Sequence, residues 1–423
     1  MKAAAALILL AGALFWGRLQ GLPELESSIH RIFPEATTTE IREGIHFVYG
    51  REALLGWVGT GTGQGYGGPM TLLVGIDTLG LVAGVEVVEK RETPVFWRMV
   101  RADEYFRALK GEPFDSLSWE YVDVVGATGA TLSAEGIVAG VRASVAKIAG
   151  PAFDVRMPRP RRPFEFGFLE VTILGLFGAG ILAQRTRGSW RRRLRWATQL
   201  TGLLVLGFWK DSPITLAKIT AFLSGYFPDP RTALAIYLLL AGFLLTSLVY
   251  GRNIYCLYAC PFGAAQRVVG AIGGGKTKIP PSWIRFLEGT RNLVVFAALF
   301  AAFLTLQPAL ASYEPFAALF SLRGVTLQWL LLFLVLVASL AIRTPWCAFF
   351  CPMRTVEVVV QDVRGWMRRG KALHGPAGGR RDAGGMAGFR KGMSLRGVAL
   401  VSLSLLVFLT IVAVLVQGFV GLG

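Results

Sequence analysis

Residues 234–250 read Leu-Ala-Ile-Tyr-Leu-Leu-Leu-Ala-Gly-Phe-Leu-Leu-Thr-Ser-Leu-Val-Tyr, an apolar run without a charged side chain. Comparable runs lie at about 4–19, 167–183, 197–209, 233–250, 293–310, 326–342 and 396–416. Several are long enough to cross a hydrocarbon core of about 30 Å, whereas the run at 197–209 is short. The sequence therefore predicts an all-α transmembrane bundle of about six helices, preceded by an N-terminal anchor.

Positive charge is concentrated in alternate connections between these runs, and the formal net charge is +17. Six arginines crowd between the second and third runs, while the connections around 211–230 and 308–324 carry little positive charge. This is the positive-inside pattern, which predicts that the basic connections are cytoplasmic. It also explains the charge without nucleic acid, and we expect no nucleic-acid partner.

The segment between the first two runs has a different character. Lys2 followed by an apolar run is typical of a cleaved signal peptide or an uncleaved anchor, and we favour an anchor at 1–21. In 22–150, period-two runs at 70–76 and 81–88 predict an antiparallel sheet in an α+β domain outside the cytoplasm. A Pro/Arg-rich linker at 151–163 leads into the transmembrane bundle, predicted at 164–423.

All four cysteines occur in two segments of identical spacing. These are Cys256-Leu-Tyr-Ala-Cys260-Pro261 and Cys347-Ala-Phe-Phe-Cys351-Pro352, each after an apolar run. Thiols four residues apart share one helix face, and the proline ends the helix there. Two such pairs supply the four thiolates that an iron–sulfur cluster or a structural zinc ion needs. Inert packing and redox-active thiols are alternatives, whereas a disulfide is disfavoured at a reducing cytoplasmic face.

A third motif lies near the end of the outer domain. It reads Asp123-Val-Val-Gly-Ala-Thr128-Gly129-Ala130-Thr131-Leu-Ser133 and predicts a strand, a turn of small residues and a helix at 134–149. Small residues allow a ligand to approach the backbone, and a helix N-terminus favours a phosphate. An ordinary helix cap by Ser133 or Thr131 explains the same residues equally well.

The Thr128-Gly-Ala-Thr131 motif resembles that of extracytoplasmic FMN-binding domains, in which the last threonine carries FMN through a phosphoester bond. Gly65-Tyr66-Gly-Gly-Pro69 and Glu92-Thr93-Pro94 resemble two further signatures of that domain. The resemblance implies covalent FMN on Thr131, with Thr128, Gly129, Ala130, Ser133, Tyr66, Glu92 and Thr93 around it. Val125 stands where the family has an aspartate, so Thr128 is the alternative attachment residue.

The cysteine segment with its flanking residues, Tyr255-Cys-x-x-x-Cys-Pro-Phe-Gly-Ala, resembles the NosR/NirI-type membrane flavoproteins. Those proteins usually end in a ferredoxin-like domain, and the short layout here resembles the membrane flavoproteins associated with reductive dehalogenases. The resemblance implies an electron-transfer component of a respiratory oxidoreductase system in the cytoplasmic membrane. Electrons are then expected to pass between the quinol pool or a cytoplasmic donor and a periplasmic oxidoreductase, through a Cys-ligated centre and FMN.

The same resemblance implies a flavin transferase as a maturation partner. The alternative function is a flavin-based redox sensor or maturation factor for a periplasmic reductase. A transporter is poorly supported because carboxylates are scarce in the apolar runs. For stacking on the flavin, the candidate residues are Trp57, Tyr66, Trp97 and Trp119.

Overall fold

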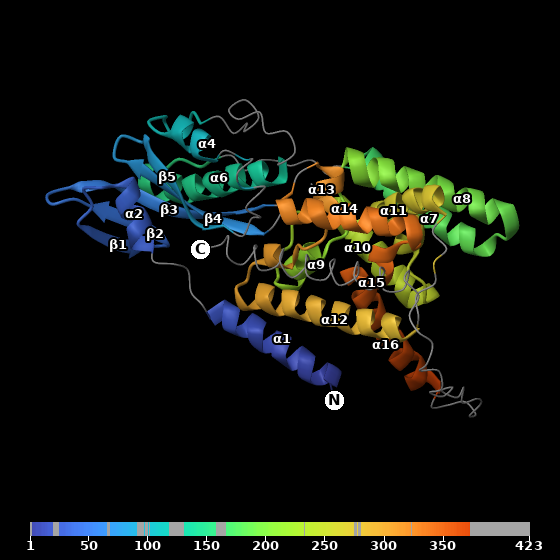
Figure 1. The fold of residues 1–423 in the computed structure, drawn as a ribbon. Helices are drawn as coiled ribbons and strands as arrows, with labels where there is room; N and C mark the ends of the chain where they lie inside the picture. Colours follow the sequence, from blue (N-terminus) through green and yellow to red (C-terminus); the bar gives the residue numbers. More distant parts are fainter. Residues whose placement is uncertain are drawn as a thin grey trace.

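The computed structural model describes residues 2–19, 25–65, 68–90, 97, 100, 102–117, 131–157, 166–231, 233–274, 277, 281–322 and 324–372. They form a β-sheet unit followed along the chain by a helical region, and the two lie next to each other (Figure 1). Helix α1 (Lys2–Leu19) belongs spatially to the helical region, where it packs along α12 (Pro281–Leu304). The predicted order of a sheet-containing unit and then helices is confirmed.

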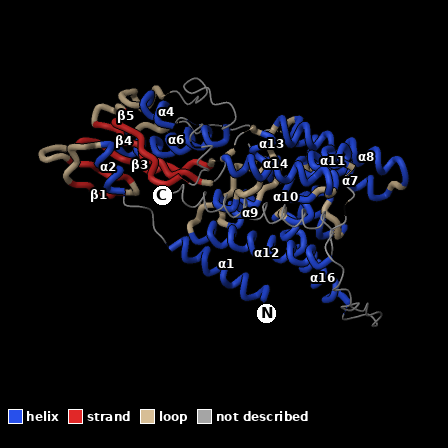
Figure 2. Tube along the Cα trace, in the orientation of Figure 1, coloured by secondary structure: helices blue, strands red, loops and turns tan. Residues whose placement is uncertain are grey.

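The sheet is an antiparallel meander in the order β1-β2-β3-β4-β5, drawn in red in Figure 2. Its strands are β1 (Thr38–Arg42), β2 (Ile45–Tyr49), β3 (Leu54–Gln64), β4 (Pro69–Asp77) and β5 (Val82–Lys90). The predicted hairpin at 70–88 is present as β4 and β5. Its turn is fixed by Asp77, whose Oδ1 accepts hydrogen bonds from the backbone N–H groups of Leu79 (2.9 Å) and Leu81 (2.8 Å).

Helices cover both faces of the sheet. Helix α2 (Leu25–Ile32) packs on one face, where Leu73 and Val58 are buried, and α6 (Thr131–Phe153) packs on the other, over Leu72 and Val74. Side chains of a strand alternate between faces, so β4 contributes to both cores. The short helix α4 (Ala102–Leu109) packs against β5.

Strand β3 and helix α6 touch through their backbones. Alternate positions of β3 face positions four residues apart on α6, and these are Gly59, Gly61 and Gly63 on the strand and Gly136, Gly140 and Ser144 on the helix. A Cβ on Gly59 would lie 2.8 Å from the carbonyl oxygen of Ser144, and a Cβ on Gly63 would overlap that of Gly136. The glycines therefore hold the first turns of α6 against the Gln64 end of β3.

The helical region begins at α7 and is built from helices and short folded connections. Its elements are α7 (Phe168–Arg185), α8 (Gly188–Thr201), η1 (Gly202–Trp209), α9 (Leu216–Leu223), α10 (Leu234–Tyr250), η2 (Tyr255–Ala259), α11 (Pro261–Gly273), α12 (Pro281–Leu304), η3 (Pro308–Ala311), α13 (Phe316–Phe320), α14 (Thr326–Ala341), α15 (Pro345–Phe349) and α16 (Pro352–Ala372). In the described part of the chain, Phe168–Arg185 and Trp283–Leu304 are long and apolar enough to cross a membrane. Shorter apolar helices occupy Ala5–Leu19, Leu234–Tyr250 and Thr326–Ala341.

Two predicted apolar runs differ from the observed helices. The short run at 197–209 is the second part of one continuous helix, α8 with the π-helical segment η1, which spans 188–209. At 1.5 Å per residue this helix is about 33 Å long. Its first half was missed because arginines 191–193 and 195 interrupt the apolar pattern. The run at 293–310 is wrong at both ends, because α12 begins at Pro281 with several charged residues and ends at Leu304. The run at 396–416 lies outside the described residues, so the count of six helices stays a prediction.

Candidate functional site

The four cysteines line one cavity of about 640 Å³ inside the helical region. All four are free thiols. The sequence predicted two thiols on one helix face, but in each segment the second cysteine, Cys260 or Cys351, lies just beyond a short helix. Pro261 and Pro352 then begin new helices, α11 and α16.

Both cysteine segments turn back into the interior after an apolar helix. Helix α10 ends at Gly251 in a left-handed conformation, and η2 then leads to Cys260. Phe262 packs against Trp346 of the other segment (6.0 Å between ring centroids) and against Phe316 (4.8 Å). Phe316 belongs to the connection between α12 and α14, so this connection packs against both cysteine segments. The cytoplasmic-face position of the cysteines stays a prediction.

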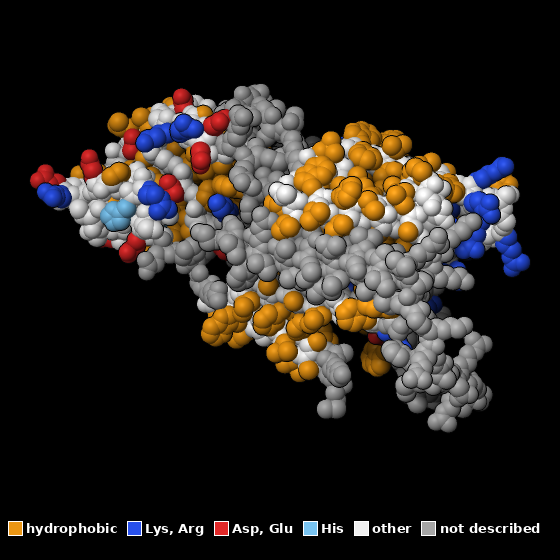
Figure 3. Space-filling model, viewed as in Figure 1, with side chains coloured by type: hydrophobic (Ala, Val, Ile, Leu, Met, Phe, Trp, Pro, Cys, Tyr) orange, Lys and Arg blue, Asp and Glu red, His pale blue; other side chains and the backbone are white. Residues whose placement is uncertain are grey.

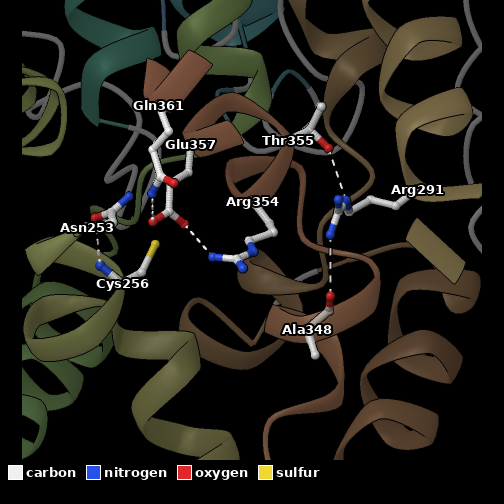
Figure 4. A network of polar contacts seen from close by, with 8 residues as sticks. All are labelled: Asn253, Cys256, Arg291, Ala348, Arg354, Thr355, Glu357 and Gln361. Atoms are coloured by element: carbon white, nitrogen blue, oxygen red, sulfur yellow. Dashed lines mark hydrogen bonds and ion pairs between the residues drawn. The ribbon is translucent and has the colours of Figure 1, made fainter. Parts of the chain in front are cut away.

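Hydrogen bonds fix the first cysteine pair. The side-chain oxygen of Asn253 accepts from the backbone N–H of Cys256 at 3.1 Å (Figure 4), and the N–H of Cys260 donates to the carbonyl of Tyr255 at 2.8 Å. The Tyr255 hydroxyl accepts from the backbone N–H of Ile214 at 3.0 Å. The first pair is thereby tied to the connection that carries α9.

Gln266 of α11 joins the two pairs. Its fully buried side chain accepts a hydrogen bond from the backbone N–H of Trp346 at 2.9 Å and donates one to the Cys347 sulfur at 3.3 Å. A hydrogen-bond donor to a ligating sulfur stabilises the negative charge on that sulfur and so changes the reduction potential of the metal centre. Sequence reasoning missed Gln266, because a lone glutamine five residues after a proline carries no recognisable pattern.

A buried cation stands beside the second pair. Arg291 is 3% exposed and donates to the carbonyl of Ala348 (3.3 Å) and to the hydroxyl of Thr355 (3.1 Å), as Figure 4 shows. In the part of the chain that the structure describes, no carboxylate forms an ion pair with it. A buried charge needs a partner of opposite sign. A thiolate-ligated centre, which is anionic, would supply that charge.

The cavity offers four thiols, a donor set that suits an iron–sulfur cluster or a zinc ion. Gly263 lies beside both pairs, because a Cβ there would lie 3.5 Å from the Cys347 sulfur and 3.7 Å from that of Cys260. The residues fit an iron–sulfur cluster with Cys256, Cys260, Cys347 and Cys351 as ligands.

The predicted flavin residues are only partly described. Thr131 is the first residue of α6, and Ser133 is buried in its first turn. The other predicted residues, Thr128, Gly129, Ala130, Tyr66, Glu92 and Thr93, lie outside the described residues, as does Trp119. Trp57 packs edge-on against Phe153 at 4.9 Å between ring centroids, so a core position explains it. The ammonium of Lys90 lies 5.1 Å from the centroid of the Trp97 ring.

A small cavity of about 90 Å³ lies where α6 meets the helical region. It is lined by Gln64 and Glu135 from the sheet unit and by Lys218 and Phe222 of α9. Glu135 lies near the start of α6, the helix that begins at Thr131. The cavity therefore borders the first part of the helix that begins at the predicted attachment residue.

The segment between η1 and α10 contains α9 and is called the α9 connection. It contributes lining residues to this cavity and to the cysteine cavity. Ile214, just before α9, lines the cysteine cavity. Leu216, the first residue of α9, donates its backbone N–H to the buried carboxylate of Glu314 at 2.6 Å. Sequence reasoning missed this connection. The signal that could have revealed it is Glu314, the lone charged residue in the stretch 305–320.

Two family models match parts of the chain. A 4Fe-4S binding domain model matches residues 232–280 and 325–371, and each match contains one cysteine pair. An FMN-binding domain model matches residues 65–146, which include the Thr128–Thr131 motif. FMN and iron–sulfur binding are thus supported by independent parts of the sequence.

Curated proteins with related sequences cover about half of the chain. Protein NirI of Paracoccus denitrificans is 29% identical over 216 residues, 48% of this chain and 31% of NirI. Regulatory protein NosR of Pseudomonas aeruginosa is 24% identical over 227 residues, 49% of this chain and 32% of NosR. The putative electron transport protein YccM of Escherichia coli is 26% identical over 144 residues, 31% of this chain and 40% of YccM. The chain thus spans about a third of the length of NirI and NosR, and the matches support a relation to the NosR/NirI-type flavoproteins.

Proposed function

We propose that this chain transfers electrons across the cytoplasmic membrane between the quinol pool or a cytoplasmic donor and a periplasmic oxidoreductase. The carriers are an iron–sulfur cluster on the four cysteines and FMN bound covalently to Thr131. The observation that carries this proposal is the α9 connection. It lines the cysteine cavity at Ile214, and it lines the small cavity beside α6 at Lys218 and Phe222.

The short reach of α9 supports a direct path. Phe222 lies eight positions after Ile214, and most of these residues belong to the single short helix α9. The sequence offered no haem between the two proposed centres, and the shared α9 segment supports electron transfer without one. When bound, FMN and the cluster supply the redox chemistry, while the protein supplies position, burial and hydrogen bonds.

Individual residues have distinct roles in this proposal. The four cysteines hold the cluster, Gln266 donates to one ligating sulfur, and Arg291 balances negative charge. Thr131, at the start of α6, carries the flavin phosphate, where a helix N-terminus is favourable for an anion. A covalent bond keeps the cofactor on a domain outside the cytoplasm, and its formation requires a flavin transferase.

The test is rapid mixing of the purified full-length protein with a quinol analogue under anaerobic conditions. Wild type should contain iron and sulfide, and its flavin absorbance should bleach at a rate compatible with turnover. Cys351→Ser should lose the iron and the quinol-dependent bleaching, while dithionite still reduces its flavin. Bleaching by quinol that is equally fast in Cys351→Ser would refute the proposed path.

The rival function is a flavin-based redox sensor or a maturation factor for a periplasmic reductase. Its support is the similarity of the chain to regulatory protein NosR. The same mixing experiment separates the two functions. A sensor requires a stable flavin redox state and no rapid flux, so flavin that quinol reduces only over many minutes would favour it.

A further inference from the structure

A second large cavity lies beside α8, at the end of the helical region away from the sheet. Its volume is about 930 Å³, and four arginines line it: Arg192 and Arg195 of α8, Arg267 of α11 and Arg343 after α14. Among the described residues that line it, none is acidic. Figure 3 shows basic side chains gathered at this end of the molecule.

The four arginines place like charges around one cavity. Like charges repel, and the repulsion grows when solvent is excluded. Arg195 is half-buried above the ring of Tyr258 (5.9 Å), and its Nε is buried without a hydrogen-bond partner in the described part of the chain. Arg267 is also half-buried and donates to the carbonyl of Leu257 at 3.3 Å. The unpaired N–H of Arg195 and the positive charge without a carboxylate in the cavity lining both favour the binding of an anion.

We propose that this cavity binds a phosphate-bearing ligand, either a nucleotide or the headgroup of an anionic phospholipid. Planar guanidinium groups match the oxygens of phosphate in paired hydrogen bonds. The volume suits a molecule of nucleotide or headgroup size and exceeds what a single inorganic ion fills. Basic pockets between helices at a cytoplasmic face are suited to lipid phosphates.

The position of the site gives the ligand access to the redox centre. Arg267 and Thr344 line both this cavity and the cysteine cavity. A phosphate bound to Arg267 therefore lies next to the predicted cluster. The site itself does not depend on the proposed electron path, because its test measures binding alone.

The test uses the full chain in phosphatidylcholine nanodiscs. Calorimetric titration with ADP probes a soluble nucleotide, and native mass spectrometry after exchange into phosphatidylglycerol probes a retained lipid. The test variant is Arg195→Gln combined with Arg343→Gln. Arg193→Gln is the matched control, because Arg193 is exposed on the same basic helix and does not line the cavity.

Wild type and Arg193→Gln should bind at least one probe, and the double variant should bind it at least about tenfold more weakly. Binding of ADP alone identifies a nucleotide site, and retention of phosphatidylglycerol alone identifies a lipid site. If the double variant unfolds at a lower temperature than wild type, the binding of Arg343→Gln alone is compared with that of the control. Arg343 is exposed, so this single change should leave the fold intact. Equal binding by the tested variant and Arg193→Gln, or no binding of either probe by wild type, would overturn the proposal.

Discussion

The contact between β3 and α6 predicts a sharp contrast between two glycine-to-alanine changes. In Gly63→Ala the new methyl group would overlap the carbonyl oxygen of Gly136, which belongs to the helix backbone and has no rotamer to change. Helix α6 must then move away from the sheet near its first turn. Gly150→Ala, in the same helix, places a methyl group where no other atom lies within 4 Å.

The expected magnitudes follow from these surroundings. Overpacking a tight core costs about 1–3 kcal/mol, and a backbone clash belongs at the upper end. We expect Gly63→Ala to lose about 3 kcal/mol, which lowers the melting temperature of a domain of this size by roughly 10 °C. Gly150→Ala should stay within about 1 kcal/mol of wild type, because the higher helix propensity of alanine is opposed by contact of its Cβ with the following Pro151.

The assay is thermal unfolding of the full chain in detergent, with covalent flavin measured by fluorescence in a denaturing gel. Gly63→Ala should unfold earlier and carry less flavin, since Thr131 begins the helix that is displaced. Gly150→Ala should keep its flavin and unfold close to the wild-type temperature. A Gly63→Ala protein with wild-type stability and flavin content would refute the argument that the backbone contact positions α6.

Three further outcomes test other parts of the structure. Gln266→Leu removes the hydrogen bond to the Cys347 sulfur, so the cluster potential should fall by roughly 50 mV in an EPR-monitored redox titration, about 1.2 kcal/mol for one electron. Thr131→Ala should abolish covalent flavin fluorescence while Thr128→Ala retains it, and the reverse result would move the attachment to Thr128. Burial lowers the pKa of His46 below its ordinary 6.5, so the unfolded chain binds the proton more tightly. Stability from the neutral imidazole is therefore present above pH 6.5 and lost as the pH falls, and His46→Gln should flatten the acid side of a melting-temperature profile.

The sequence predicted elements whose pattern is local and regular. The hairpin of β4 and β5 followed from period-two alternation and the Asp77 turn, and four apolar helices followed from their composition. The arginine-rich first half of α8 and the charged first half of α12 were not predictable in the same way. Their helicity depends on packing against neighbours, which overrides the local pattern.

The cysteine site shows the same division. Spacing predicted two pairs, and the structure gathers them around one cavity. Spacing could not predict that the two pairs meet, because their approach depends on where the chain turns back after α10 and α14. It also could not reveal Gln266 and Arg291, whose importance comes from partners 80 and 57 residues away in the chain.

The two family matches at 232–280 and 325–371 correspond to two similar halves of the helical region. In each half an apolar helix, α10 or α14, leads into a short helix, a cysteine and a proline that begins a further helix. A folded connection also precedes each half and lines the same cavity. Ile214 precedes α10 and Phe316 precedes α14. A duplicated unit explains why each half carries one pair of cysteines. Neither half could complete a four-thiolate shell alone, so a cluster ligated by all four cysteines would also hold the two halves together, and its removal should loosen their packing.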